Sequence, residues 1–230
     1  MTPHPFDPSS GEQLEFDLSH VEFAENPEPR CPVLLLLDNS GSMAGERIAQ
    51  LNEGLQVFKA DLMADSLAAK RCEIGIVSFG PVQQVTDFVS VLDFEPPTLQ
   101  PLGDTPLGGA VTYGLELLRQ RKETIRQNGV ALYRPWVFLI TDGAPTDDWH
   151  AAAAAVREGE AAKSFAFFSV GVQGADLSVL GQIGGREPLM LSGVRFRELF
   201  QWLSSSLRSV SQSMPGDRVV LESPAGWAEV

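Results

Sequence analysis

One short segment of the chain, residues 38–42, carries oxygen-bearing side chains at every second position. Its sequence is Asp38-Asn39-Ser40-Gly41-Ser42, and it directly follows an apolar run at residues 33–37. One carboxylate and two hydroxyls on a tight turn at a strand end suit a hard divalent cation, because Mg²⁺, Mn²⁺ and Ca²⁺ prefer oxygen ligands. Asp, Asn, Ser and Gly are also ordinary turn residues, so this segment alone does not define a site.

Two later loops carry further oxygen ligands. Gly103-Asp104-Thr105-Pro106 precedes a helical pattern, and Thr141-Asp142-Gly143 follows the apolar run at residues 136–140. In open α/β sheets, ligands bind at the carboxyl ends of the strands, where the strand order reverses. We therefore expect the three loops to border the same edge of a sheet.

Each loop also has a simpler interpretation. Thr105 is placed to cap a helix, Asp142 lies in an ordinary turn sequence, and Ser40 and Ser42 could cap the helix that begins before Ile48. The order of the three loops, each at a strand end, favours a metal site over these separate roles.

The elements expected around the loops alternate between strands and helices. Apolar runs typical of strands buried on both faces occur at residues 32–37, 72–79, 136–140 and 165–172, with a short one at 188–191. Apolar residues at helical spacing occur at residues 48–62, 107–118, 149–162, 176–183 and 196–210. Residues 82–91 follow a turn too short for a parallel crossover, which predicts an antiparallel edge strand. The pattern predicts an α/β fold with a mostly parallel sheet covered on both faces.

Composition narrows the classes of partner and compartment. The chain has 230 residues and a formal net charge of -13, which disfavours nucleic acid and anionic membranes as partners. Its two cysteines, Cys31 and Cys72, could pair, but so few cysteines are more typical of reduced thiols in a cytosolic protein. Residues 1–8 lack the features of a signal peptide, and we expect a cytoplasmic protein.

The expected domain boundaries follow the changes in composition. Residues 1–30 form an acidic, Pro-rich N-terminal extension, residues 31–214 the folded domain, and residues 215–230 an extended tail. Within the extension, the apolar residues are expected to form a short strand or to lie along the domain surface: Phe16, Leu18, Val21 and Phe23. Docking residues expected in the tail are Val219, Val220, Leu221 and Trp227. The basic cluster at residues 119–122 is interpreted as a solvated helix face, and Asp147 and Asp148 as caps of the following helix.

The three loops, taken as residues 38–43, 103–108 and 140–147, resemble the metal-ion-dependent adhesion site of the von Willebrand factor type A (VWA) family. Within that family they look most like the bacterial TerY-like branch, which is linked to tellurite resistance. The resemblance covers roughly residues 31–213. It implies a Rossmann-like, doubly wound, mostly parallel sheet with one antiparallel edge strand and helices on both faces.

The resemblance also implies a ligand set. Ser40, Ser42 and Thr105 would bind the cation through their hydroxyls, and Asp38 and Asp142 would act directly or through water. The expected ion is Mg²⁺, with Mn²⁺ or Ca²⁺ as alternatives. Mg²⁺ takes about six oxygens, so five protein groups leave a position for an Asp or Glu carboxylate from a partner protein.

The implied partner is a protein of a stress-response or tellurite-resistance system, such as its kinase or phosphatase. Asp104 stands where glycine is common in the family. Its carboxylate could strengthen the surroundings of the site or repel an acidic partner.

An enzyme is the competing hypothesis. A metal-dependent phosphatase or hydrolase would use Asp38 as nucleophile or the metal to activate water. The three loops contain no His, Lys or Arg as an obvious general base or phosphate clamp, and Ser40 stands where aspartyl-phosphate hydrolases carry a second acidic residue. We therefore expect a non-catalytic protein-binding module.

Overall fold

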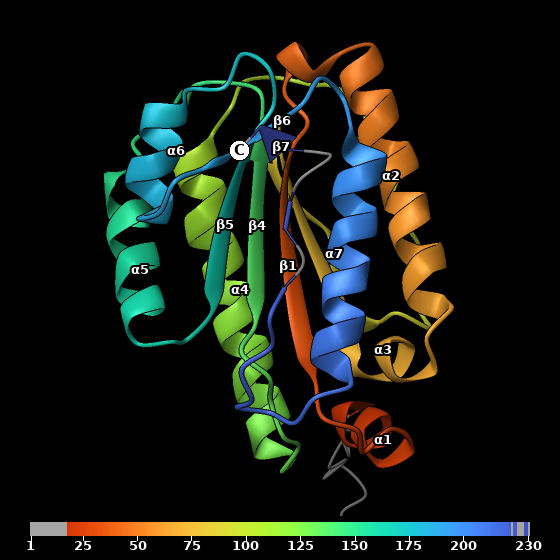
Figure 1. Cartoon of the computed structure of the whole chain (residues 1–230). Helices are drawn as coiled ribbons and strands as arrows, with labels where there is room; N and C mark the ends of the chain where they lie inside the picture. The colour runs from red at the N-terminus through yellow and green to blue at the C-terminus, as the bar shows by residue number, and fades with distance from the viewer. Residues whose placement is uncertain (1–17, 222, 225–227, 230) are drawn as a thin grey trace, which may run out of the picture.

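A single sheet forms the centre of the computed structural model, which describes residues 18–221, 223–224 and 228–229 (Figure 1). Within these residues the sheet has seven strands in the order β3-β2-β1-β4-β5-β6-β7. The strands are β1 (Cys31–Asp38), β2 (Cys72–Phe79), β3 (Val82–Ser90), β4 (Trp136–Thr141), β5 (Ala166–Gly171), β6 (Leu189–Leu191) and β7 (Ala228–Glu229). The five central strands run parallel to one another: β2, β1, β4, β5 and β6. The two edge strands, β3 and β7, run antiparallel to their neighbours.

The strand order reverses at β1. The chain leaves β1 for β2 and the edge strand β3, then crosses back to β4 on the other side of β1. Leu37 pairs in register with Ser78 of β2 and with Ile140 of β4, so the carboxyl ends of these strands lie side by side. The crevice at such a reversal is where open α/β sheets bind ligands.

Helices cover both faces of the sheet, in two layers (Figure 1). One layer contains α2 (Glu46–Met63), α3 (Ser66–Arg71) and α7 (Phe196–Ser211). The other contains α4 (Leu107–Gln127), α5 (His150–Ala161) and α6 (Leu177–Gly184). Side chains of β1 alternate between the two cores: Leu35 belongs to the core under α2 and α7, and Leu36 to the core under α4 and α5. This two-sided burial explains the unbroken apolar run of the strand.

The predicted fold class is confirmed, including the antiparallel edge strand β3. The sequence did not indicate the second antiparallel strand, β7, which pairs with β6 through two residues at the other edge. It also did not indicate α3, a six-residue helix whose N-cap, Asp65, accepts hydrogen bonds from the backbone N–H groups of Leu67 and Ala68. No helix in the described part of the chain has the length and apolar character needed to span a membrane.

The N-terminal extension contains a helix, α1 (Leu18–Glu25), so the first of the two expected alternatives, a short strand, was wrong. Phe23 is buried, and the guanidinium groups of Arg30 and Arg121 each lie 5.1 Å from its ring centre. In the tail, Val219 and Leu221 pack against the core, whereas Val220 is 94% exposed. Phe16 and Trp227 lie outside the described residues, and the boundaries at residues 30 and 214 stay predictions.

A buried ion network joins α1, β2 and α4. Glu73 is fully buried and lies 2.9 Å from Nε of Arg30 and 2.7 Å from NH2 of Arg121, which also pairs with Glu22. Burial lowers the pKa of Arg30, although the charge of Glu73 opposes the shift. The interpretation of residues 119–122 as a solvated face was therefore wrong for Arg121.

The two cysteines are buried free thiols on neighbouring strands. Cys31 and Cys72 are paired in register across β1 and β2. The contact with the Cys31 thiol, together with burial, raises the pKa of Cys72 well above its ordinary value. Both thiols therefore contribute to the core as small apolar side chains.

Candidate functional site

The three loops meet above the carboxyl ends of β1 and β4, and backbone hydrogen bonds hold them together. The N–H of Gly41 donates to the carbonyl of Gly103 at 3.0 Å, and the N–H of Leu102 donates to the carbonyl of Asn39 at 2.7 Å. The N–H of Thr146 donates to the carbonyl of Thr105 at 2.9 Å. The first loop is thus joined to the second, and the second to the third, without any side chain.

Asp38 is the last residue of β1, and its carboxylate is fully buried. One oxygen accepts a hydrogen bond from the N–H of Ser40 at 2.8 Å, and the other accepts from the hydroxyl of Thr141 on β4. Burial raises the pKa of Asp38, and the hydrogen bonds from Ser40 and Thr141 oppose that shift. The carboxylate is therefore fixed in orientation, and a positive charge beside it would be stabilised.

A chain of short contacts links the other predicted ligands. The hydroxyl oxygens of Ser40 and Ser42 lie 2.9 Å apart, and the Ser42 hydroxyl donates to Oδ1 of Asp142 at 2.6 Å. A methyl group placed on Gly143 would lie 3.2 Å from Oγ1 of Thr105 and 3.9 Å from Oγ of Ser42. The Thr105 and Ser42 hydroxyls therefore face the same small space, so the structure brings all five predicted residues to one edge of the sheet.

The residues fit a hard divalent cation in donor type and in spacing. The cluster offers two carboxylates and three hydroxyls, and every donor is an oxygen. With Mg²⁺–oxygen distances of 2.0–2.1 Å, adjacent ligands of an octahedron lie about 2.9 Å apart, which is the separation of the Ser40 and Ser42 hydroxyl oxygens. Among the described residues, no group of three or more His, Cys, Asp or Glu side chains could hold a metal, so cation binding at this cluster would depend on the hydroxyls.

The simpler interpretations of the hydroxyls as helix caps were wrong. Helix α2 begins after Gly45, and Ser40 precedes only a three-residue 3₁₀ turn without a side-chain capping bond. The N-cap of α4 is Pro106, and Thr105 contributes only its backbone carbonyl to that turn. The hydroxyls are therefore not needed to terminate a helix.

Arg47 is a site residue that the sequence did not indicate. Its NH1 group donates to Oδ2 of Asp142 at 2.5 Å and to the carbonyl of Ser42 at 3.0 Å. The Arg47 side chain is 31% exposed and that of Asp142 is fully buried. The guanidinium thus supplies a positive charge at the edge of the cluster. Arg47 lies in the first turn of α2, and only the fold brings it to a residue 95 positions away.

Asp147 connects the third loop to α4. Its carboxylate accepts hydrogen bonds from the N–H groups of Gly108 and Gly109, at 2.9 and 2.7 Å. The expectation that Asp147 caps the following helix, α5, was wrong. Asp148 accepts a hydrogen bond from the N–H of His150, the first residue of α5, although the N-cap residue is Trp149. An acidic side chain is favourable at the positive end of α4, and the contact fixes the loop that carries Asp142.

Asp104 lies on the outer side of the same edge. Its side chain is exposed, and no hydrogen bond or ion pair involves it within the described part of the chain. Asp104 therefore contributes no contact to the internal geometry of the cluster.

A doubly wound sheet that carries oxygen ligands at its strand-order reversal defines an α/β domain with a binding edge. Residues 33–199 match the model of the von Willebrand factor type A domain, and the chain belongs to this family. VWA domains generally mediate binding between proteins and often bind a divalent metal.

Known proteins with similar sequence or structure agree with this assignment. The collagen alpha-5(VI) chain of Mus musculus is 25% identical over 181 residues, which cover 74% of this chain and 6% of that protein. Proximal thread matrix protein 1 from the mussel byssus has a similar structure, with a TM-score of 0.54, 17% identity, and coverage of 78% of this chain and 48% of that one. The pilus adhesin SpaC from Lactobacillus rhamnosus GG gives a TM-score of 0.61 at 13% identity, covering 79% and 31%. This chain therefore spans less than half the length of each of these proteins.

Proposed function

We propose that this chain is a protein-binding module that holds Mg²⁺, or a similar divalent cation, through Asp38, Ser40, Ser42, Thr105 and Asp142. The observation that carries the proposal is the convergence of the three hydroxyls and two carboxylates, with adjacent serine oxygens at the spacing of Mg²⁺ ligands. A bound cation would supply a Lewis-acidic position that accepts an outside oxygen. The ligand proposed for that position is an Asp or Glu carboxylate of the partner.

In such a site, individual residues would have different roles. Asp38 is buried and doubly hydrogen-bonded, so it fixes negative charge beneath the cation position. Ser42 is exposed and lies at the rim, where a partner would approach. Arg47 beside Asp142 offers a second contact for a carboxylate, because a guanidinium pairs well with carboxylate oxygens.

A binding role agrees better with the site than a hydrolytic one. Apart from one another, the five side chains have as hydrogen-bond partners, in the described residues, the Thr141 hydroxyl, backbone groups and Arg47. None of these is a general base at neutral pH, since an arginine stays protonated. We therefore infer a non-enzymatic function.

The proposed compartment, branch of the family and partner rest on the sequence motifs. We propose a cytoplasmic protein of the TerY-like branch, acting in a tellurite-resistance or stress-response system with a kinase or phosphatase as partner. The net charge of -13 would bias the choice of partner and its association rate more than the affinity.

Titration calorimetry with Mg²⁺ and Mn²⁺ tests the cation site. Asp38→Asn and Thr105→Ala are each expected to weaken cation binding at least about tenfold, because each removes an oxygen ligand or its charge. Ser178→Ala, at an exposed position on α6, is the matched control and is expected to bind like the wild type. Circular dichroism checks that each variant is folded. Unchanged affinity in a folded Thr105→Ala variant would refute the ligand set.

Partner capture tests the binding role. We expect wild-type protein to retain a partner in Mg²⁺ and to release it in chelator, and Thr105→Ala to retain none under either condition. Metal-dependent turnover of phosphoesters that is lost in Thr105→Ala would instead favour the hydrolase.

A further inference from the structure

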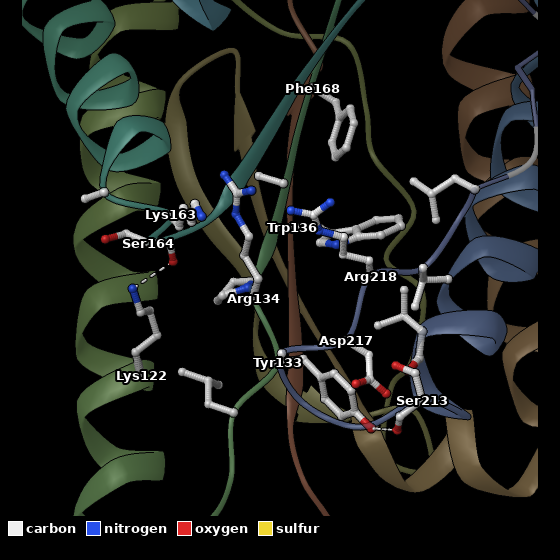
Figure 2. Close-up of a pocket in the computed structure, with 18 of the residues that line it drawn as sticks. Lys122, Tyr133, Arg134, Trp136, Lys163, Ser164, Phe168, Ser213, Asp217 and Arg218 are labelled. Carbon is white, nitrogen blue, oxygen red and sulfur yellow. Dashed lines mark hydrogen bonds between the residues drawn. The ribbon is translucent and has the colours of Figure 1, made fainter.

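A cavity lies at the opposite end of the sheet from the proposed cation site. It has a volume of about 770 Å³ and is lined by the first residues of β4 and β5, the C-terminal half of α4 and the tail at residues 213–221 (Figure 2). The tail runs across a part of the sheet that α7 does not cover (Figure 1). A cavity of this size is in the usual range for small-molecule sites.

The lining is strongly basic in an otherwise acidic protein. Six of the 17 basic residues of the chain contribute to it: Lys122, Arg126, Arg134, Lys163, Arg186 and Arg218. Among the described residues, Asp217 is the sole acidic residue of this lining. Glu187 belongs to a separate, shallow pocket. A concentration of positive charge in a chain of net charge -13 marks this surface as distinct.

Three of these six cations have neither a hydrogen bond nor an ion pair in the described part of the chain. Arg134 and Arg186 both pair with Glu160, and Lys122 donates to the carbonyl of Ser164 at 2.9 Å. Within the described part of the chain, no hydrogen bond or ion pair involves the side chains of the other three: Arg126, Lys163 and Arg218. Burial, and then the charge of Arg126, lowers the pKa of Lys122, as expected where like charges gather.

Aromatic and aliphatic side chains form the remaining wall. Trp136 is buried with its ring 5.6 Å from that of Phe168, and Val219 lies on the tail opposite. Figure 2 shows Arg134 and Arg218 reaching into the cavity from different walls, with Trp136 and Phe168 beside them. The cavity therefore combines an apolar surface with several convergent cations.

We propose that this cavity binds an organic phosphate, a ligand with a phosphate or polyphosphate group attached to an apolar or aromatic part. Three uncompensated cations match a group with two or more negative charges, whereas a single carboxylate carries only one. Arginine presents a planar fork of donors that suits phosphate oxygens. The wall formed by Trp136 and Phe168 would contact the apolar part.

Titration calorimetry with chelator present, so that the cation site plays no part, tests the proposal. Adenosine triphosphate is expected to bind with a Kd below about 1 mM, more tightly than inorganic pyrophosphate, and adenosine is not expected to bind. Arg126→Glu and Arg218→Glu change exposed side chains, and each is expected to weaken binding at least about tenfold. Lys70→Glu, on an exposed position of α3, makes the same change in charge outside the cavity and is expected to bind like the wild type.

Four outcomes would overturn the proposal. Absence of binding by adenosine triphosphate and pyrophosphate would remove the site, and equal binding by the Arg218→Glu and Lys70→Glu variants would place it elsewhere. Tricarballylate binding as tightly as pyrophosphate would show a site for carboxylates. Pyrophosphate binding as tightly as adenosine triphosphate would remove the role of the aromatic wall. If the proposed cation site binds no cation, these measurements are unaffected, because they are all made with chelator present.

Discussion

Replacement of Arg47 by methionine is expected to tighten cation binding. In the structure the guanidinium of Arg47 donates to the Asp142 carboxylate and to the Ser42 carbonyl, so it already neutralises part of the charge that would attract a cation. A divalent ion at the proposed site must compete with this contact. Methionine keeps much of the apolar stem of arginine and removes the charge.

The size of the effect follows from the two contacts. A hydrogen bond to a charged group contributes about 1.5–3 kcal/mol, and the 31% exposure of Arg47 reduces this through solvent screening. A competing contact of about 1–2 kcal/mol corresponds to a roughly 5- to 30-fold change in affinity. We therefore expect the Kd for Mg²⁺ to fall by roughly that factor in Arg47→Met.

Titration calorimetry with Mg²⁺, at constant ionic strength, measures the change. Arg197→Met is the matched control, because Arg197 forms a half-exposed ion pair with Glu53 away from the three loops. It is expected to leave the Kd unchanged. An unchanged or weaker Mg²⁺ affinity in Arg47→Met, with the control unaltered, would show that Arg47 does not compete with the ion.

Three further predictions concern the structure around the site. Glu73→Gln leaves two arginines with reduced compensation in the buried network, and urea unfolding is expected to show a loss of about 3–5 kcal/mol, against almost none for the exposed Glu158→Gln. Asp65→Ala removes the cap of α3 and is expected to cost about 1 kcal/mol at neutral pH. Hydrogen bonding, first from the Ala68 N–H, lowers the folded-state pKa of Asp65, so its stabilisation is present above the unfolded-state pKa and is lost as pH falls through the folded-state value. Gly103→Ala would strain a backbone with φ of 68° and clash with the carbonyl of Gly80, and it is expected to lower both the melting temperature and the Mg²⁺ affinity.

Each of these predictions has a contrary result. Equal unfolding free energies for Glu73→Gln and Glu158→Gln would mean that the network adds no net stability. A penalty for Asp65→Ala that stays constant between neutral and acidic pH would contradict an ionised cap. Normal Mg²⁺ affinity in Gly103→Ala would show that the second loop can move without disturbing Thr105.

The parts of the fold that the sequence predicted are those that local pattern determines. The run at residues 33–37 is buried on both faces, and its composition alone indicates a central parallel strand. Helix α3 and strand β7 were missed because six and two residues are too few to show a period. Strand β7 exists through its pairing with β6. The two strands are far apart in the sequence, and only folding brings them side by side.

The candidate site, too, could be predicted from the sequence only in part. Asp38, Ser40 and Ser42 are neighbours in the sequence, and the loops that carry Thr105 and Asp142 could be added because parallel strands bring their carboxyl ends to one edge. Arg47 and Asp147 act on residues 95 and 39 positions away. Their roles depend on how α2 and α4 pack against the loops. No spacing of residues in the sequence predicts this packing.

The backbone hydrogen bonds between the three loops have a consequence for how the domain would respond to its surroundings. Because these bonds need no ion, chelation is expected to leave the fold intact, and a cation would stabilise it only by mass action, as RT ln(1 + [L]/Kd). Occupancy would then follow the free ion concentration reversibly and with little rearrangement. Attachment to a partner would be adjustable from outside the protein, without the cost of refolding.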